Sequence, residues 1–176
     1  MARTTTIRLS DRIEQIRSEE LPPRRERKQE IKEAAAEYDN AWLIPDELEE
    51  KYERIKDEIA SLEGEASTLE HYTEKWGDDE FTIRELSVGS VSAIQDDVAE
   101  ASDVNMDGEG TPKGGYARKR TLEMGLKEKP AQAPAVENFP DPVGDLLFDL
   151  VDEFNTTGEI SLGNSSLKIE MMNSEN

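Results

Sequence analysis

The chain contains no cysteine and a single histidine, His71. The absence of cysteine excludes disulfides, thiolate nucleophiles and every cysteine-based zinc or iron–sulfur site. One histidine is too few for a multi-histidine metal site. The sequence also lacks a G-x-S-x-G elbow for a catalytic serine and a G-x-x-x-x-G-K-S/T loop for a nucleotide phosphate. We therefore predict a protein that is not an enzyme and that uses neither a metal nor another cofactor.

Apolar residues are scarce as well, because only 35% of the 176 residues are hydrophobic and 6% are aromatic. The mean hydropathy is -0.78, and no run approaches the roughly 20 apolar residues that a membrane span needs. Residues 1–10 lack the apolar segment of a signal peptide. We expect a soluble protein that stays inside the cell, makes no membrane contact and buries its few apolar residues on helical stripes.

Acidic residues dominate the charge: 41 Asp and Glu against 21 Lys and Arg give a net charge of -20. Such a surface repels itself in dilute buffer, but at 1 M salt the Debye length is only about 3 Å and the repulsion largely vanishes. The composition therefore favours a salt-adapted cytoplasm. The alternative, an acidic decoy for basic proteins, requires a concentrated acidic block, whereas the acidic residues here are spread along the whole chain.

Residues 1–32 depart from this acidity, since they hold nine basic and six acidic residues. A basic arm attached to an acidic body can bind nucleic acid or fold back on the body itself.

The best-patterned long segment begins after Pro45. Its apolar residues alternate spacings of four and three, which keeps one seam directed at a partner helix: Leu48, Tyr52, Ile55, Ile59, Leu62, Ala66 and Leu69. Two interpretations remain open. The helix either docks or self-associates through residues 48–69, or it forms one arm of an intramolecular hairpin with residues 11–38.

The preceding residues read as a short strand or extended arm at 4–9, followed by two helices. Ser10 caps the first helix, which Pro22 and Pro23 are expected to end. The second helix, at 24–39, carries a thin apolar stripe of Ile31, Ala34, Ala35 and Tyr38. Further along, the patterns predict a short strand or an extended entry at 80–86, helices at 88–101 and 116–126 with Leu122 and Leu126 buried, and a linker at 127–138.

A final helix begins at Asp141 and Pro142, a capping residue and a proline suited to a first helical turn. Its apolar stripe has the spacing of one helix face. We expect this stripe, with Leu48, Tyr52, Ile55, Ile59 and Leu62, to bind a partner; it consists of Val143, Leu146, Leu147, Leu150, Val151 and Phe154.

These elements predict a mainly α protein, with an N-terminal helical hairpin or coiled coil followed by a small helical domain and flexible acidic loops and tail. The expected segments are a basic arm with short helices at 1–40, a long amphipathic helix at 41–78, a small helical domain at 79–158 with a loop at 103–115, and a flexible tail at 159–176.

The loop at 103–114 resembles the first half of an EF-hand calcium site. Asp103, Asn105 and Asp107 occupy ligand positions 1, 3 and 5, and Gly108 follows at position 6. Position 12, which requires a bidentate glutamate, is Gly114. We therefore expect an acidic loop without a bound cation.

Residues 4–11, Thr-Thr-Thr-Ile-Arg-Leu-Ser-Asp, resemble the opening of ribbon-helix-helix DNA-binding proteins. In that family two chains pair their strands and insert them into the major groove. The resemblance implies that Thr4, Thr6 and Arg8 would face the bases. The proline pair and the absence of the usual turn before the second helix depart from the family pattern.

A second resemblance covers more of the chain. The order of segments 80–86, 95–97, 114–125 and 139–155 is similar to that of tail assembly chaperones of tailed viruses. The resemblance implies a small acidic helical protein that coats the aggregation-prone tape measure protein while tail tube subunits polymerise around it. The N-terminal 76 residues depart from the simplest form of that family.

We accordingly expect a virus tail assembly chaperone of a halophile-infecting virus, located in the host cytoplasm, with the tape measure and tail tube proteins as partners. The alternatives are a resident structural component of the virion tail and a dimeric ribbon-helix-helix regulator of transcription. Nucleic acid is not the partner that we expect.

Overall fold

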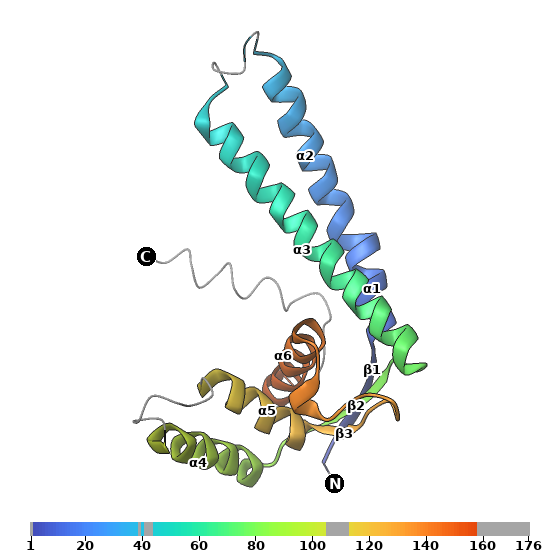
Figure 1. Cartoon of the computed structure of the whole chain (residues 1–176), viewed down its shortest axis with the longest axis vertical. Helices are drawn as coiled ribbons and strands as arrows, with labels where there is room; N and C mark the ends of the chain where they lie inside the picture. The colour runs from blue at the N-terminus through green and yellow to red at the C-terminus, as the bar shows by residue number, and fades with distance from the viewer. Residues whose placement is uncertain (1, 39, 41–43, 105–112, 158–176) are drawn as a thin grey trace. The chain divides into compact units, whose positions relative to one another are not determined.

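The computed structural model of the chain describes residues 2–38, 40, 44–104 and 113–157. The fold is mainly α, as predicted, with a small three-stranded sheet (Figure 1). The chain divides into two compact units: Ser10–Tyr72 forms one, and Met1–Leu9 together with Thr73–Asn176 forms the other. The first residues therefore belong with the C-terminal half rather than with the segment 1–40 expected from sequence. The predicted tail at 159–176 lies outside the described residues.

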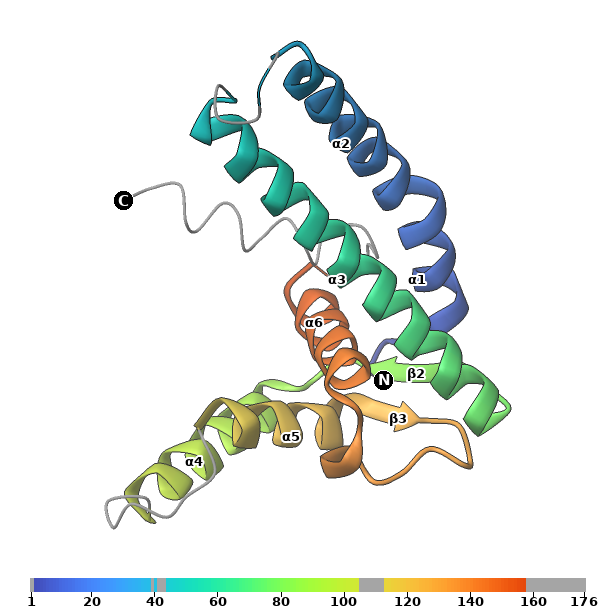
Figure 2. The same cartoon turned by 45° about the horizontal axis from the view of Figure 1, so that its top comes forward.

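The unit Ser10–Tyr72 is a helical hairpin, which realises the intramolecular alternative. One arm runs through α1 (Leu9–Gln15), a π-helical segment η1 (Ile16–Glu20) and α2 (Leu21–Ala36), and the other arm is α3 (Asp46–Trp76). The two arms lie side by side in both views (Figures 1 and 2). The predicted seam is buried from its third residue to its last: Ile55, Ile59, Leu62, Ala66 and Leu69.

The prediction that Pro22 and Pro23 end the first helix is wrong. Both prolines lie in the first turn of α2, where their missing N–H groups cost little. The helix reaches them through η1, whose wider turn replaces the regular i→i−4 ladder that proline would break. The chain thus remains helical from Leu9 to Ala36.

The sheet of the second unit has the order β1-β2-β3 and is antiparallel throughout. Strand β1 (Thr4–Arg8) pairs with β2 (Glu80–Arg84) in a register that places Thr6 opposite Thr82. Of the two interpretations left open for 4–9 and for 80–86, the structure shows the strand in each, although Leu9 already belongs to α1 and β2 ends at Arg84.

The predicted linker at 127–138 is instead part of the folded unit. It begins in β3 (Leu126–Glu128), which pairs with β2, and it continues to a 3₁₀ turn at Val136–Asn138. Pro130 and Ala133 between them are buried. Leu126, expected to be buried, is only half-buried, because it lies in β3 and not in the preceding helix.

The core of this unit is built on α6 (Asp141–Thr157), as its strong periodicity predicts. Phe81 and Ile83 from β2 and Leu122 from α5 (Lys113–Gly125) are buried with it. Trp76, Phe81 and Phe139 form an aromatic cluster in which each pair of ring centroids is 6.1 Å apart. Phe81 meets Trp76 and Phe139 edge to face, whereas Trp76 and Phe139 are tilted at 39°, and the edge-to-face contacts add to the stabilisation that burial of the rings provides.

Helices α5 and α6 approach closely at a glycine. A Cβ atom at Gly125 would lie 2.5 Å from Cγ1 of Val151, so no larger residue fits there without movement. Helix α4 (Val88–Val104) packs beside α5, with Arg120 of α5 bound to Asp97 of α4. No helix in the described part of the chain is long and apolar enough to cross a membrane.

Candidate functional site

Ion pairs between basic residues of the first arm and glutamates at positions 58–70 of α3 join the two arms of the hairpin away from its tip. In descending order along α3, the pairs are Arg17–Glu70, Arg12–Glu65, Arg25–Glu63 and Arg24–Glu58. A basic N-terminal arm can bind nucleic acid or pack against the acidic part of its own chain. In this structure the arm packs against acidic residues of α3.

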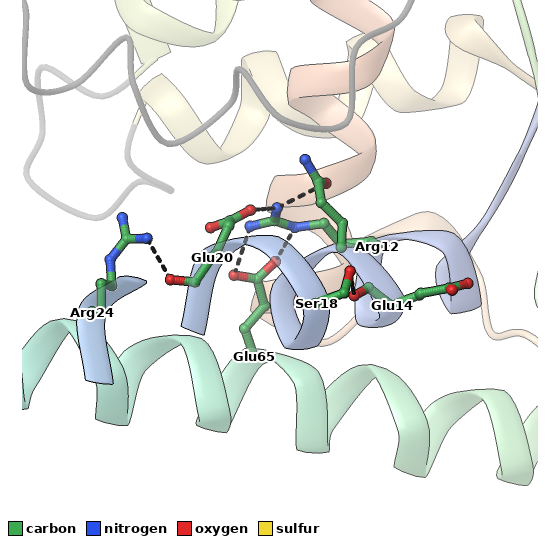
Figure 3. A network of polar contacts seen from close by, with 7 residues as sticks. Arg12, Glu14, Ser18, Glu20, Arg24 and Glu65 are labelled. Atoms are coloured by element: carbon green, nitrogen blue, oxygen red, sulfur yellow. Dashed lines mark hydrogen bonds and ion pairs between the residues drawn. The ribbon is translucent and has the colours of Figure 1, made fainter. Parts of the chain in front are cut away.

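Arg12 is the centre of the most buried of these contacts, because only 2% of the residue is exposed. Its Nε donates to Oε1 of Glu65 at 2.9 Å, Nη2 donates to Oε2 at 3.3 Å, and Nη1 reaches Gln15 and Glu20 (Figure 3). Burial alone lowers the pKa of Arg12, but hydrogen bonds and charge from Glu65 and Glu20 outweigh it and raise the pKa. The guanidinium is therefore a fixed positive charge inside the hairpin.

The π-helical segment explains how Glu20 joins this cluster. Eight residues separate it from Arg12, and in a regular α-helix that spacing rotates a side chain by about 80°. The wider turn of η1 uses more residues per turn and returns Glu20 towards the face of Arg12. Arg24 then donates to the backbone oxygen of Glu20 at 3.0 Å, which continues the network into α2 (Figure 3).

Near the turn of the hairpin, buried contacts give way to a groove of about 450 Å³. Its apolar lining comes from pairs of residues spaced four apart on each arm, Ile31 with Ala35 on α2 and Leu48 with Tyr52 on α3, together with Ile44. All five side chains are half-buried. The groove is therefore the stretch of the hairpin seam that the chain covers incompletely.

Charged residues border this groove on both arms. Lys32 lines it on α2, and Glu49 and Glu53 line it on α3. Lys28 of α2 lies over the ring of Tyr52, with Nζ 5.5 Å from the ring centroid, which fixes the aromatic face by a cation–π contact. We take this apolar groove with its charged rim, hereafter the tip groove, as the candidate functional site.

The expectation that the stripe of α6 binds a partner needs correction. Every residue of that stripe is buried in the unit's own core, each with at most 5% exposed: Val143, Leu146, Leu147, Leu150, Val151 and Phe154. Ile55, Ile59 and Leu62 are likewise buried. A helical apolar stripe needs a cover, and here the chain supplies it. Of the predicted partner-binding residues, Leu48 and Tyr52 alone are half-buried and line a groove.

The residues of the ribbon-helix-helix resemblance are exposed, but their strand is already paired. Thr4, Thr6 and Arg8 lie on β1, which pairs with β2 of the same chain. The resemblance implies that this strand pairs with its counterpart in a second chain. Arg8 forms an ion pair with Glu80 across the pairing of β1 with β2.

A second, shallower groove of about 360 Å³ lies beside β3, where Leu122, Leu126, Ala135 and Val136 are bordered by Lys127 and Glu128. Sequence reasoning missed it because residues 127–138 were taken as a linker. Its charged side chains alternate in sign, so the groove concentrates no charge of one sign that would attract a charged ligand.

Among the described residues, no group of three or more His, Asp or Glu side chains could hold a metal ion. The EF-hand-like loop cannot be judged in this way, because residues 105–112 lie outside the described part of the chain.

Comparisons with protein-family models, with curated proteins and with solved structures found no match for this chain.

Proposed function

We propose that the protein is a non-enzymatic virus tail assembly chaperone that binds a helical segment of the tape measure protein in the tip groove. The observation that carries the proposal is the groove itself. Its apolar side chains repeat at a spacing of four on each wall, so a third amphipathic helix that packs there continues the ridges of the hairpin.

The partner is suggested by the similarity of segments 80–86, 95–97, 114–125 and 139–155 to tail assembly chaperones. A tape measure protein is long and helical, and its apolar stripes are exposed until the tail tube encloses it. A hairpin that covers one such stripe keeps it from aggregating. The dense surface carboxylates of the chaperone then keep the complexes hydrated and in solution.

Co-expression with the tape measure protein of the same virus tests the proposal. We expect the wild-type chain to keep the tape measure in solution and to copurify with it. Leu48→Asp should remove both effects, because it places a charge in the groove. Val91→Asp is the matched control, since Val91 is an apolar residue of α4 with 40% exposed. A tape measure that aggregates equally with wild type and with Leu48→Asp would contradict the proposal.

The alternatives give different results in further experiments. A ribbon-helix-helix regulator would shift a specific DNA duplex, and Thr6→Ala together with Arg8→Ala would abolish the shift. A resident tail component would be found by mass spectrometry in purified virus particles, whereas a chaperone would be absent from them.

A further inference from the structure

The two walls of the tip groove carry opposite charge. On α2, the stretch 24–32 contains five basic and two acidic residues, whereas on α3 the stretch 46–53 contains five acidic and one basic residue. A chain that is acidic overall thus presents a basic edge and an acidic edge on either side of one apolar strip.

The charges nearest the strip are available to a partner. Arg24 and Arg25 are engaged by Glu58 and Glu63 of the same chain. In contrast, within the described residues neither Lys32 nor Glu49 forms an ion pair, although both line the groove. Each wall therefore offers one charge of its own sign beside the half-buried apolar side chains.

We infer that the tip groove is a self-complementary surface that pairs with the tip groove of a second copy of the chain. A two-fold axis along the hairpin places α2 of one copy over α3 of the other. Lys32 of each copy then faces Glu49 of the other, which gives two equivalent contacts per dimer. The two apolar strips meet between these contacts. An axis across the hairpin would instead oppose α2 to α2 and α3 to α3, which charge repulsion disfavours.

The dimer goes beyond the proposed function, because it forms without any client. The competition between this dimer and the tape measure protein for the same groove does rest on the proposed function. In the absence of the tape measure, pairing covers Ile31, Leu48 and Tyr52 and keeps this strip from binding other apolar surfaces non-specifically. A client helix then displaces the second copy.

Sedimentation velocity of the full chain at 0.15 M salt tests the pairing. We expect a reversible monomer–dimer equilibrium. Lys32→Glu and Glu49→Lys should each weaken it roughly tenfold or more, because each reversal converts two attractive contacts into two repulsive ones. Glu30→Lys and Glu50→Lys are the controls, since these residues are exposed on the same helices but do not line the groove, so the dimer should change far less.

Mixing the two weakened variants is the decisive step. A heterodimer of Lys32→Glu with Glu49→Lys restores opposite charges at both contacts, so the mixture should dimerise like wild type although each variant alone does not. An effect confined to one chain cannot give this result. Circular dichroism of each variant confirms that the hairpin is folded.

Two results would overturn the inference. One is a wild-type chain that stays monomeric up to about 100 μM. The other is a dimer that responds equally to the groove and control variants, or that mixing does not restore. Neither result bears on copurification with the tape measure, so the failure of the dimer and the failure of the proposed function are distinguishable.

Discussion

Replacing Arg12 by methionine should lower the free energy of opening the hairpin more than the replacement of any exposed residue of the hairpin does. The side chain is almost completely buried, and its removal leaves the carboxylates of Glu65 and Glu20 facing one another without a cation. Breaking a buried ion pair from one side costs about 3–5 kcal/mol. Because the two glutamates keep 25% and 13% of their side chains exposed, water can partly rehydrate them. We therefore expect a loss near the lower end, about 3 kcal/mol.

Hydrogen exchange of the α3 amides measures this loss directly, because it reports the free energy of opening the hairpin separately from the other unit. A loss of about 3 kcal/mol corresponds to exchange roughly 150-fold faster. Arg25→Met is the control: Arg25 also pairs with a glutamate of α3, but 60% of its side chain is exposed, so its loss should be at most about 1 kcal/mol.

The double variant Arg12→Met with Glu65→Met should recover part of the loss, since an apolar pair can replace a buried ion pair. Equal and small accelerations in Arg12→Met and Arg25→Met would refute the reasoning. They would mean that the buried cluster contributes no more than a surface pair.

Three further substitutions test other contacts. Gly125→Ala should lower the free energy of unfolding by about 2 kcal/mol, because its Cβ would meet Val151 at 2.5 Å, and Val151→Ala should remove most of this cost in a double-mutant cycle. Gly64→Ala should raise stability by roughly 0.5–1 kcal/mol in urea unfolding, because nothing lies within 4 Å of its added Cβ in α3; a loss would contradict the helix there. A hydrogen bond from the side chain of Arg3, supported by its backbone N–H and its charge, lowers the pKa of Glu85. The stabilisation is therefore present above the ordinary pKa of a glutamate and disappears as the pH falls through the lowered value, so Glu85→Gln should lower Tm at pH 7 but not in strong acid.

Periodicity predicted which residues are buried far better than it predicted what buries them. The spacing of Leu146, Leu147 and Leu150 correctly indicated one apolar face on α6. The same pattern serves a core helix and a docking helix alike, because both need an apolar cover, so the spacing could not tell that this stripe is buried in the chain's own core. In α3 the ambiguity was between a second chain and residues 11–38, and ion pairs such as Arg12–Glu65 resolve it for this structure. Pairings between residues 53 positions apart leave no local signal.

The candidate site was only half visible in the sequence. Leu48 and Tyr52 belonged to the predicted seam, and Ile31 and Ala35 formed a recognisable but thin stripe on another predicted helix. Their meeting depends on the alignment of two arms, which η1 helps to set, and a π-helical turn has no simple sequence pattern. β3 was missed for a related reason, since three residues beside proline carry too little periodicity to predict a strand.

The pairing of β1 with β2 also has a consequence for the order of folding. Arg8 and Glu80 are neighbours across the sheet but lie 72 positions apart in sequence, with the whole hairpin between them. Closing a flexible loop of that length costs about 4 kcal/mol of chain entropy. The hairpin can form first from its own local helices, and because its two arms run antiparallel it returns the chain to where it began. The Leu9 N–H then donates to the Asp79 oxygen at 3.1 Å, joining the two ends of the insertion. A hairpin that forms first thus lowers the loop-closure entropy that the pairing of β1 with β2 would otherwise cost, so a pairing of only five residues can form.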